Sequence, residues 1–200
     1  MANQLHSLRV RPEGFVKGAY VSKQTLKILR EAYPENPREN GDYLGHMLCF
    51  HSRYCLGDQH DDVSSSEFGS WGEVEDYARE NYGAVVILPL HLYDHSGVTM
   101  NTTGFFCPWD SGQVGIIYAT EEGIREDWGD DNLDADRIEH VKSILRAEVK
   151  EYDDYLRGDV YCYELYGADD EFVDSCCGFY GDESVEYILS ETGFAGVEEQ

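Results

Sequence analysis

Histidines and aspartates concentrate in one stretch of this 200-residue chain. Five of the seven histidines fall within residues 46–95, among several aspartates. Imidazoles together with a carboxylate are ligands that zinc and other transition metals accept. No established ligand spacing occurs, so no cofactor is predicted, although zinc or another transition metal would suit these side chains. The alternative is that the histidines make hydrogen bonds in loops and at strand ends. The spacing favours this alternative. The candidate ligands are His46, His51, His60, His91 and His95.

A second kind of chemistry is nucleophilic catalysis. His95 could act as a general base that an aspartate orients, with Cys107 or Ser111 as the nucleophile. The G-x-S-x-G nucleophile elbow is absent, because Trp109 stands where its first glycine would be. The residues therefore leave enzymatic activity open and favour a protein that is not an enzyme. The candidate catalytic residues are His95, Asp94, Cys107 and Asp110.

The run CPWDSGQVG at residues 107–115 is the most distinctive in the chain. Trp-Asp-Ser-Gly is typical of a turn, and the glycines permit close backbone approach. Residues 94–97, Asp-His-Ser-Gly, predict a tight hairpin turn. Such turns suit a ligand pocket, a protein-contact loop or a purely structural corner. The loop residues singled out for a ligand or partner are His91, Asp94, His95, Trp109, Asp110 and Ser111.

The charge distribution bears on partners. The net charge is −25, and residues 121–200 hold 25 Asp and Glu against six Lys and Arg. This acidity predicts no direct contact with nucleic acid or membranes, and attraction to basic protein surfaces, including those that bind nucleic acid. Salt adaptation or simple solubility explains the same composition. The expected acidic contact residues are Glu148, Glu151, Asp154, Asp169, Asp170 and Glu171.

The order of expected strands and helices along the chain predicts an α+β fold, with a mainly antiparallel sheet of at least four strands and packed helices. The length predicts a single domain over residues 1–200. An acidic tail at about 191–200 is expected to be disordered. The predicted strands cover 5–10, 44–54, 84–93, 113–119, 160–166 and 172–177, the last two as a hairpin. The predicted helices cover about 22–32, 73–81, 121–128, 135–157 and 183–189.

The helix at 135–157 is the strongest prediction among the elements. Its apolar residues recur at three- and four-residue steps and form one stripe. Asp136 and Glu139 resemble a capping pair, and Gly158 supplies the stop. Glu148, Glu151 and Asp154 are expected on the opposite, exposed face.

The termini and cysteines suggest a compartment. The N-terminal residues lack the apolar core of a signal peptide, and no apolar run reaches the length of a membrane helix. The protein is therefore expected in the interior of a cell, the host cytoplasm, with its six cysteines reduced. The spacing of the cysteines matches neither a disulfide framework nor a closed zinc site.

The runs GHMLCFHSRYCLGDQHD, LPLHLYDHSGVTMNTTGFFCPWDSGQVGIIYAT, RAEVKEYDDYLRGDVYCYEL and VDSCCGFYG together resemble a family of small uncharacterised proteins of tailed phages, prophages and mobile elements. The resemblance covers about residues 15–182. It implies an accessory gene of a virus or mobile element, and it supplies no catalytic residue.

The favoured function is accordingly a non-enzymatic, acidic, DNA-mimic-like inhibitor of a host nuclease or a restriction or CRISPR component. The alternatives are a metal-dependent enzyme or small-molecule binder using loops 46–110, and a structural or virion-associated protein. The oligomeric state does not follow from the residues.

Overall fold

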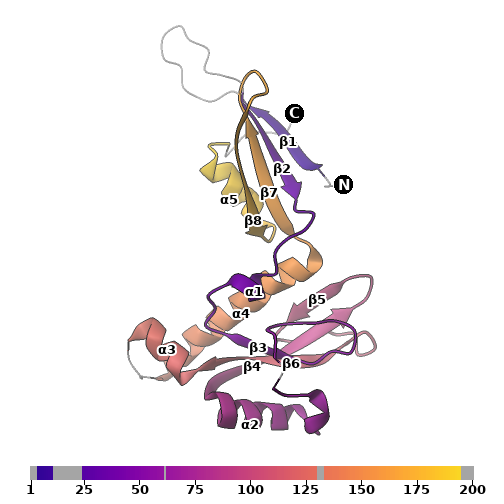
Figure 1. Cartoon of the computed structure of the whole chain (residues 1–200), viewed down its shortest axis with the longest axis vertical. Helices are drawn as coiled ribbons and strands as arrows, with labels where there is room; N and C mark the ends of the chain where they lie inside the picture. The colour runs from indigo at the N-terminus through magenta and orange to yellow at the C-terminus, as the bar shows by residue number, and fades with distance from the viewer. Residues whose placement is uncertain (1–3, 11–23, 61, 130–132, 195–200) are drawn as a thin grey trace. The chain divides into compact units, whose positions relative to one another are not determined.

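A computed structural model of the chain describes residues 4–10, 24–60, 62–129 and 133–194. Within these residues the strands form two antiparallel sheets of four strands each, and helices pack on them (Figure 1). The expected α+β class is confirmed, with two sheets in place of one. The contacts divide the chain into two compact units, residues 1–35 with 158–200 and residues 36–157. That all 200 residues make one domain stays a prediction.

The first unit is built from both ends of the chain. Its sheet has the order β1-β2-β7-β8, and the predicted hairpin corresponds to β7 and β8. Helix α5 packs on this sheet through Ile188, which lies in one apolar cluster with Leu26, Ile28 and Tyr161. The elements are β1 (Gln4–Val10), β2 (Gln24–Arg30), β7 (Val160–Tyr166), β8 (Phe172–Tyr180) and α5 (Glu183–Glu191).

The helix predicted at about 22–32 is wrong within the described residues, which begin here at Gln24. This segment is strand β2, paired with β1 and with β7. Leu26 and Ile28 are completely buried and two residues apart, as a strand with one buried face requires. The same apolar residues also fit a helical stripe, and pairing with two distant strands decides between the two patterns.

The second unit is continuous in sequence and contains the remaining elements. Its sheet has the order β3-β6-β4-β5, so the two apolar strands β4 and β6 are central. The elements are α1 (Pro37–Asn40), β3 (His46–Cys49), the 3-10 turn η1 (Ser65–Glu67), α2 (Trp71–Tyr82), β4 (Ala84–Asp94), β5 (Val98–Asn101), β6 (Ser111–Thr120), α3 (Glu121–Trp128) and α4 (Ala135–Arg157).

Helices cover both faces of the second sheet. Figure 1 shows α2 on one side of this sheet and α4 on the other. Ile117 of β6 packs in a cluster with Leu145 of α4, whereas its neighbour Ile116 packs in a cluster with Val74 of α2. Successive strand residues point to opposite faces, so a strand between two helical layers must be apolar at consecutive positions. This layering explains the uninterrupted apolar runs.

Helix α4 has the predicted bounds, but two details of the prediction are wrong. Its N-terminus is capped by Asp134, whose carboxylate accepts the Arg137 N–H at 2.8 Å, and not by the pair Asp136 and Glu139. Gly158 follows the helix with φ +73°, as its predicted role in stopping the helix requires.

The second wrong detail is the expected exposure of the α4 carboxylates, because two of them are buried. Glu148 is only 8% exposed and Asp154 only 5%, so neither belongs to an exposed acidic face. Glu148 lies three residues after Leu145 and four before Tyr152, which places it on the buried stripe.

Two further expectations concern the chain end and the membrane. Residues 195–200 of the expected acidic tail lie outside the described residues, while Phe194 is buried against the α5 cluster.

Among the residues that the structure describes, no helix is both long and apolar enough to cross a membrane.

Candidate functional site

The ends of strands β4 and β6 bring the predicted loop residues together. The two strands are antiparallel, with Tyr93 opposite Ser111, and the ladder continues through the Asp94 N–H, which donates to the Asp110 carbonyl at 2.9 Å. The turn after β4 is the predicted one: Ser96 has φ +57°, and Val98 pairs with Asp94. The sheet register therefore places the two predicted turns side by side.

The side chains at this edge do not form a catalytic triad. His95 Nδ1 lies 3.4 Å from Asp110 Oδ2, and the Cys107 thiol donates to the same carboxylate oxygen at 3.5 Å. The Ser111 hydroxyl donates to the Cys107 carbonyl at 2.5 Å, which closes the turn. The carboxylate thus lies between the imidazole and the thiol, whereas nucleophilic catalysis needs the base against the nucleophile.

The five candidate histidine ligands serve other contacts. His46 packs on Tyr118, and His51 stacks on Tyr54 with ring centroids 5.0 Å apart. His91 lies beside the turn at Gly104. Within the described part of the chain, the only group of three side chains spaced to hold a metal contains none of these histidines.

That group lies in the first unit and consists of Glu31, Cys162 and Cys177. Cys162 and Cys177 form a disulfide, so the expectation that all six cysteines are free thiols is wrong in this structure. Antiparallel pairing of β7 with β8 brings the two sulfurs together, and pairing partners cannot be read from spacing alone. The other four cysteines are free thiols, and burial raises the pKa of Cys49 to about 12.

The second unit has an open hollow of about 1410 Å³. The chain between β3 and α2 forms most of its wall, with His51 and His60 among the lining residues. Three aromatic rings line it, and the ring centroid of Phe50 lies 6.0 Å from that of Phe68 and 6.4 Å from that of Trp71. Serine, histidine, amide and charged side chains line the hollow beside these rings, so its wall mixes polar and aromatic groups.

A buried ion network holds this segment in place. The Arg38 side chain is only 3% exposed, and its guanidinium donates to both oxygens of Asp58, at 2.7 and 3.0 Å. It also lies 3.4 Å from Glu148, which accepts the N–H groups of Leu44 and Gly45. Burial raises the pKa of Glu148, against the lowering effect of these donors. The network needs all three charges, since a buried charge left unpaired is costly.

His60 presents an unpaired atom in this hollow. Its Nε2 lies 2.8 Å from the Cys49 carbonyl, which requires the proton on Nε2 and leaves Nδ1 as an acceptor. Nδ1 is buried and has no hydrogen-bond partner among the described residues. A buried acceptor without a donor is uncommon in folded proteins.

A smaller hollow of about 310 Å³ adjoins this site, since His51 lines both. Four of the predicted loop residues line the smaller hollow, namely Asp94, Trp109, Asp110 and Ser111. His91 and His95 do not line it. Part of the predicted loop therefore lines a concave surface.

Exposed aromatic and basic side chains lie on the segments that form the two hollows: Arg53 and Trp109 line the smaller hollow, and Tyr54 lines the larger one. Trp109 is 92% exposed and Phe106 fully exposed, so the turn does not fix the Trp109 ring against the protein. Arg53 forms an ion pair with Asp94, and its guanidinium lies 5.5 Å from the Tyr54 ring centroid. We call Arg53, Tyr54, Phe106 and Trp109 the aromatic rim. Trp, Tyr and Arg are the residues most enriched where one protein binds another.

The expected acidic contacts divide between exposed and buried positions. Asp169, Asp170 and Glu171 form the exposed turn of the β7–β8 hairpin. Glu151 is half-buried and accepts a hydrogen bond from the Tyr43 hydroxyl. Only the hairpin turn therefore presents the carboxylates in the expected way, because Glu148 and Asp154 are buried.

Several residues that shape these sites were not singled out from the sequence. Arg38 and Asp58 are separated by 20 residues, and Glu31 and Cys162 by far more, so neither grouping has a local spacing signal. Arg53 has such a signal, because it is the only basic residue between Arg38 and Arg79 in a −25 chain, whereas Arg38 lies in the N-terminal part, where basic residues are frequent. Comparison of the chain with models of known protein families, with curated proteins and with solved structures gives no match.

Proposed function

We propose that this protein is a non-enzymatic binder of a basic protein surface, encoded by a virus or mobile element and active in the host cytoplasm. The observation that carries the proposal is the aromatic rim: Trp109, 92% exposed, on a chain of net charge −25. An exposed tryptophan leaves a large apolar area in water unless a partner covers it. The partner we propose is a host nuclease or a restriction or CRISPR component.

The electrostatics support a basic partner. Asp110 borders the hollow next to Trp109, so an incoming Lys or Arg side chain would meet this carboxylate and the face of an indole ring, whereas Asp94 is already paired with Arg53. The exposed Asp169–Glu171 turn offers a second, separate cluster of negative charge. Because long-range attraction between opposite charges is screened by salt, such a complex depends on ionic strength.

The test measures binding of the full chain to a panel of purified restriction and CRISPR nucleases. We expect binding to at least one of them, weakening steeply between about 0.05 M and about 0.3 M salt, and competition by duplex DNA. Trp109→Ala should weaken that binding at least tenfold, as for a central interface tryptophan. Tyr33→Ala is the matched control, because Tyr33 is equally exposed at 92%.

A triple change at the hairpin, Asp169→Asn with Asp170→Asn and Glu171→Gln, should reduce the salt dependence while the fold is kept. No binding to any nuclease of the panel would overturn the proposal. So would binding that is insensitive to salt, or equal losses from Trp109→Ala and Tyr33→Ala.

A second candidate function rests on a different observation, the buried Nδ1 of His60 in the aromatic-walled hollow. It favours a small ligand that places a hydrogen-bond donor at this atom and an apolar group on Phe50 and Trp71. Thermal-shift screening of amide and amine compounds tests it. A compound that stabilises the wild type and not His60→Phe supports this function, and no stabilising compound argues against it.

A further inference from the structure

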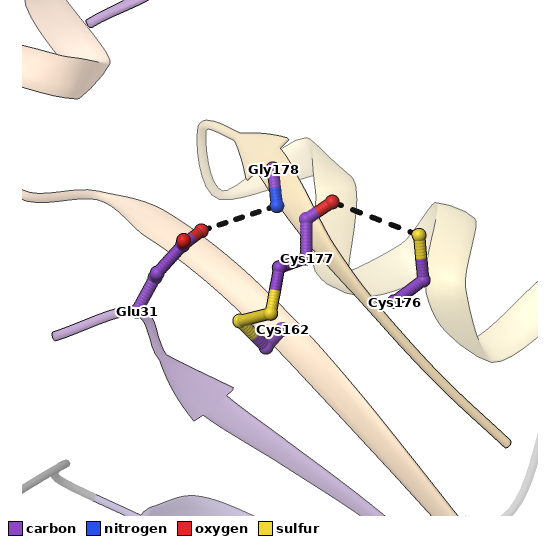
Figure 2. The surroundings of a disulfide bond; sticks show 5 residues. All are labelled: Glu31, Cys162, Cys176, Cys177 and Gly178. Carbon is purple, nitrogen blue, oxygen red and sulfur yellow. Dashed lines mark hydrogen bonds between the residues drawn. A yellow bond between two sulfur atoms is a disulfide. The ribbon is translucent and has the colours of Figure 1, made fainter. Parts of the chain in front are cut away.

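The first unit contains a group of side chains that the proposed binding function does not use. Figure 2 shows the Glu31 carboxylate, Cys162 and Cys177 gathered at one position on the sheet. One carboxylate oxygen of Glu31 and the two sulfurs all lie within 4.8 Å of one another. Thiolate and carboxylate ligands together are a donor set that zinc accepts.

Three neighbouring strands explain how these residues meet. Glu31 directly follows β2 and extends its pairing with β7, since its N–H donates to the Val160 carbonyl at 2.8 Å. On the other side of β7, Tyr161 pairs with Phe179 and Tyr163 with Cys176. Cys162 of β7 therefore stands opposite two residues of β8, Cys177 and Gly178, which is a β-bulge.

The bulge also orients the carboxylate. Gly178 has φ +84°, and its N–H donates to Glu31 Oε2 at 3.1 Å. A ligating carboxylate is commonly held by a hydrogen bond of this kind. Cys176 lies apart from the group, with its sulfur 3.6 Å from the Cys177 carbonyl on the other side of the strand (Figure 2).

The site is open to solvent and to reductant. Cys177 is exposed and Glu31 half-buried, while Cys162 is buried beneath them. An exposed disulfide can be reached by an attacking thiolate. Around one tetrahedral zinc, with Zn–S of about 2.3 Å and Zn–O of about 2.0 Å, ligand atoms lie roughly 3.3–3.8 Å apart. The three ligand atoms already lie within 4.8 Å of one another, and they would have to adjust to that spacing once the two sulfurs are no longer bonded.

We propose that the reduced protein binds one zinc ion through Glu31, Cys162 and Cys177, and that the disulfide is the metal-free state of the same site. Reduction takes two electrons and two protons from a dithiol, which becomes a disulfide, and leaves two cysteine thiols. Zinc binding then releases both thiol protons and forms two Zn–S bonds and one Zn–O bond. Water occupies the fourth position, because the structure offers no fourth side-chain ligand among the described residues.

The consequence is a site whose metal content follows the redox state. In a reducing compartment, zinc would join β2, β7 and β8, whereas under oxidation the covalent bond joins β7 and β8 only. This function is independent of the aromatic rim, which lies in the other unit of the chain, and the Asp169–Glu171 turn of the same hairpin supplies none of its ligands.

The test compares reduced and oxidised full-length protein, with cobalt as a spectroscopic probe for zinc. Protein reduced with dithiothreitol and desalted without oxygen should bind one equivalent of Co²⁺ with a thiolate-to-cobalt charge-transfer band, which Zn²⁺ displaces. Air-oxidised protein of the same sequence should show no band. Cys162→Ser and Cys177→Ser should abolish the band, and Glu31→Gln should weaken Co²⁺ binding at least tenfold.

Cys176→Ser is the matched control and should keep the band, since this thiol points away from the group. Circular dichroism of each variant checks folding, and the oxidised wild type tests the site without any substitution. Absence of Co²⁺ binding by the reduced wild type would overturn the proposal. A band that survives Cys162→Ser, or that the oxidised protein also shows, would overturn it equally.

Discussion

At the scale of single residues, several polar groups of the second unit hold the segment between β3 and α2 in place. Asp58 accepts hydrogen bonds from Arg38 and from the Met47 N–H at 2.9 Å, and its own N–H donates to the Met47 carbonyl. The neighbouring Gly57 donates its N–H to the Tyr152 hydroxyl at 2.9 Å. The wall of the larger hollow thus depends on a few positions with demanding geometry.

Gly57→Ala tests that dependence. Gly57 has φ +69°, and an added Cβ would lie 2.8 Å from the Met47 carbonyl oxygen, so strain and a backbone clash combine. We expect the free energy of unfolding to fall by about 1–3 kcal/mol, measured by urea denaturation. Gly97→Ala is the control, because an added Cβ there meets nothing within 4 Å. Equal effects of the two substitutions would contradict this account.

At the scale of elements, helix α4 connects the core to the hollow. Val141, Leu145 and Val149 of its apolar stripe are buried against the sheet. The same face carries Glu148 into the network with Arg38, and Tyr152 to Gly57. A single helix face therefore packs the core and positions the wall of the candidate site.

The Tyr152 phenol provides a pH-dependent test of this contact. Burial raises the pKa of Tyr152 to about 12, above its value of about 10 in the unfolded chain. The stabilisation is fully present below about pH 10 and is lost as the pH rises towards the folded pKa. The difference in unfolding free energy between the wild type and Tyr152→Phe should shift against the wild type by about 1 kcal/mol between about pH 9 and about pH 11.

Urea denaturation at each pH measures this difference, with Tyr33→Phe, an exposed phenol, as the control. A difference that is constant across this pH range would mean that the Tyr152 hydroxyl ionises in the folded protein as it does in the unfolded chain.

At the scale of the whole molecule, the net charge of −25 is the dominant property. The buried carboxylates are paired: Asp159 with Arg30 at 2.5 Å, Asp154 with Lys150 at 2.8 Å, and Glu148 with Arg38. The remaining negative charges repel one another at the surface, which disfavours the compact state. This repulsion is common to the mimic and the salt-adaptation interpretations.

Salt should therefore stabilise the protein, and the range over which it does so separates the two interpretations. Screening lengths fall from about 10 Å at 0.1 M to about 3 Å at 1 M, so simple repulsion is relieved largely below about 0.5 M. We expect the Tm to rise with NaCl and KCl alike up to about that concentration and then to level off. A Tm that keeps rising through molar KCl would favour salt adaptation, and a Tm that falls would contradict both.

Local features were predictable from the sequence. The bounds of α3 and α4 agree with the predicted 121–128 and 135–157, because periodicity and the glycines that end these helices act within a few residues. The hairpin of β7 and β8 and the turn at residues 94–97 were predictable for the same reason. The exposed turn at Asp169–Glu171 follows directly from that hairpin.

Only the tertiary structure decided which distant segments meet. Residues 24–30 form a strand because β7, more than 130 residues later, pairs with them. Glu148 can be buried because Arg38 and the Gly45 N–H donate hydrogen bonds to its carboxylate. Cys162 is bonded to Cys177 because β8 lies beside β7. The physical reason is that periodicity and capping depend on neighbouring residues, whereas burial, strand pairing and metal-ligand geometry depend on contacts that chain folding alone creates.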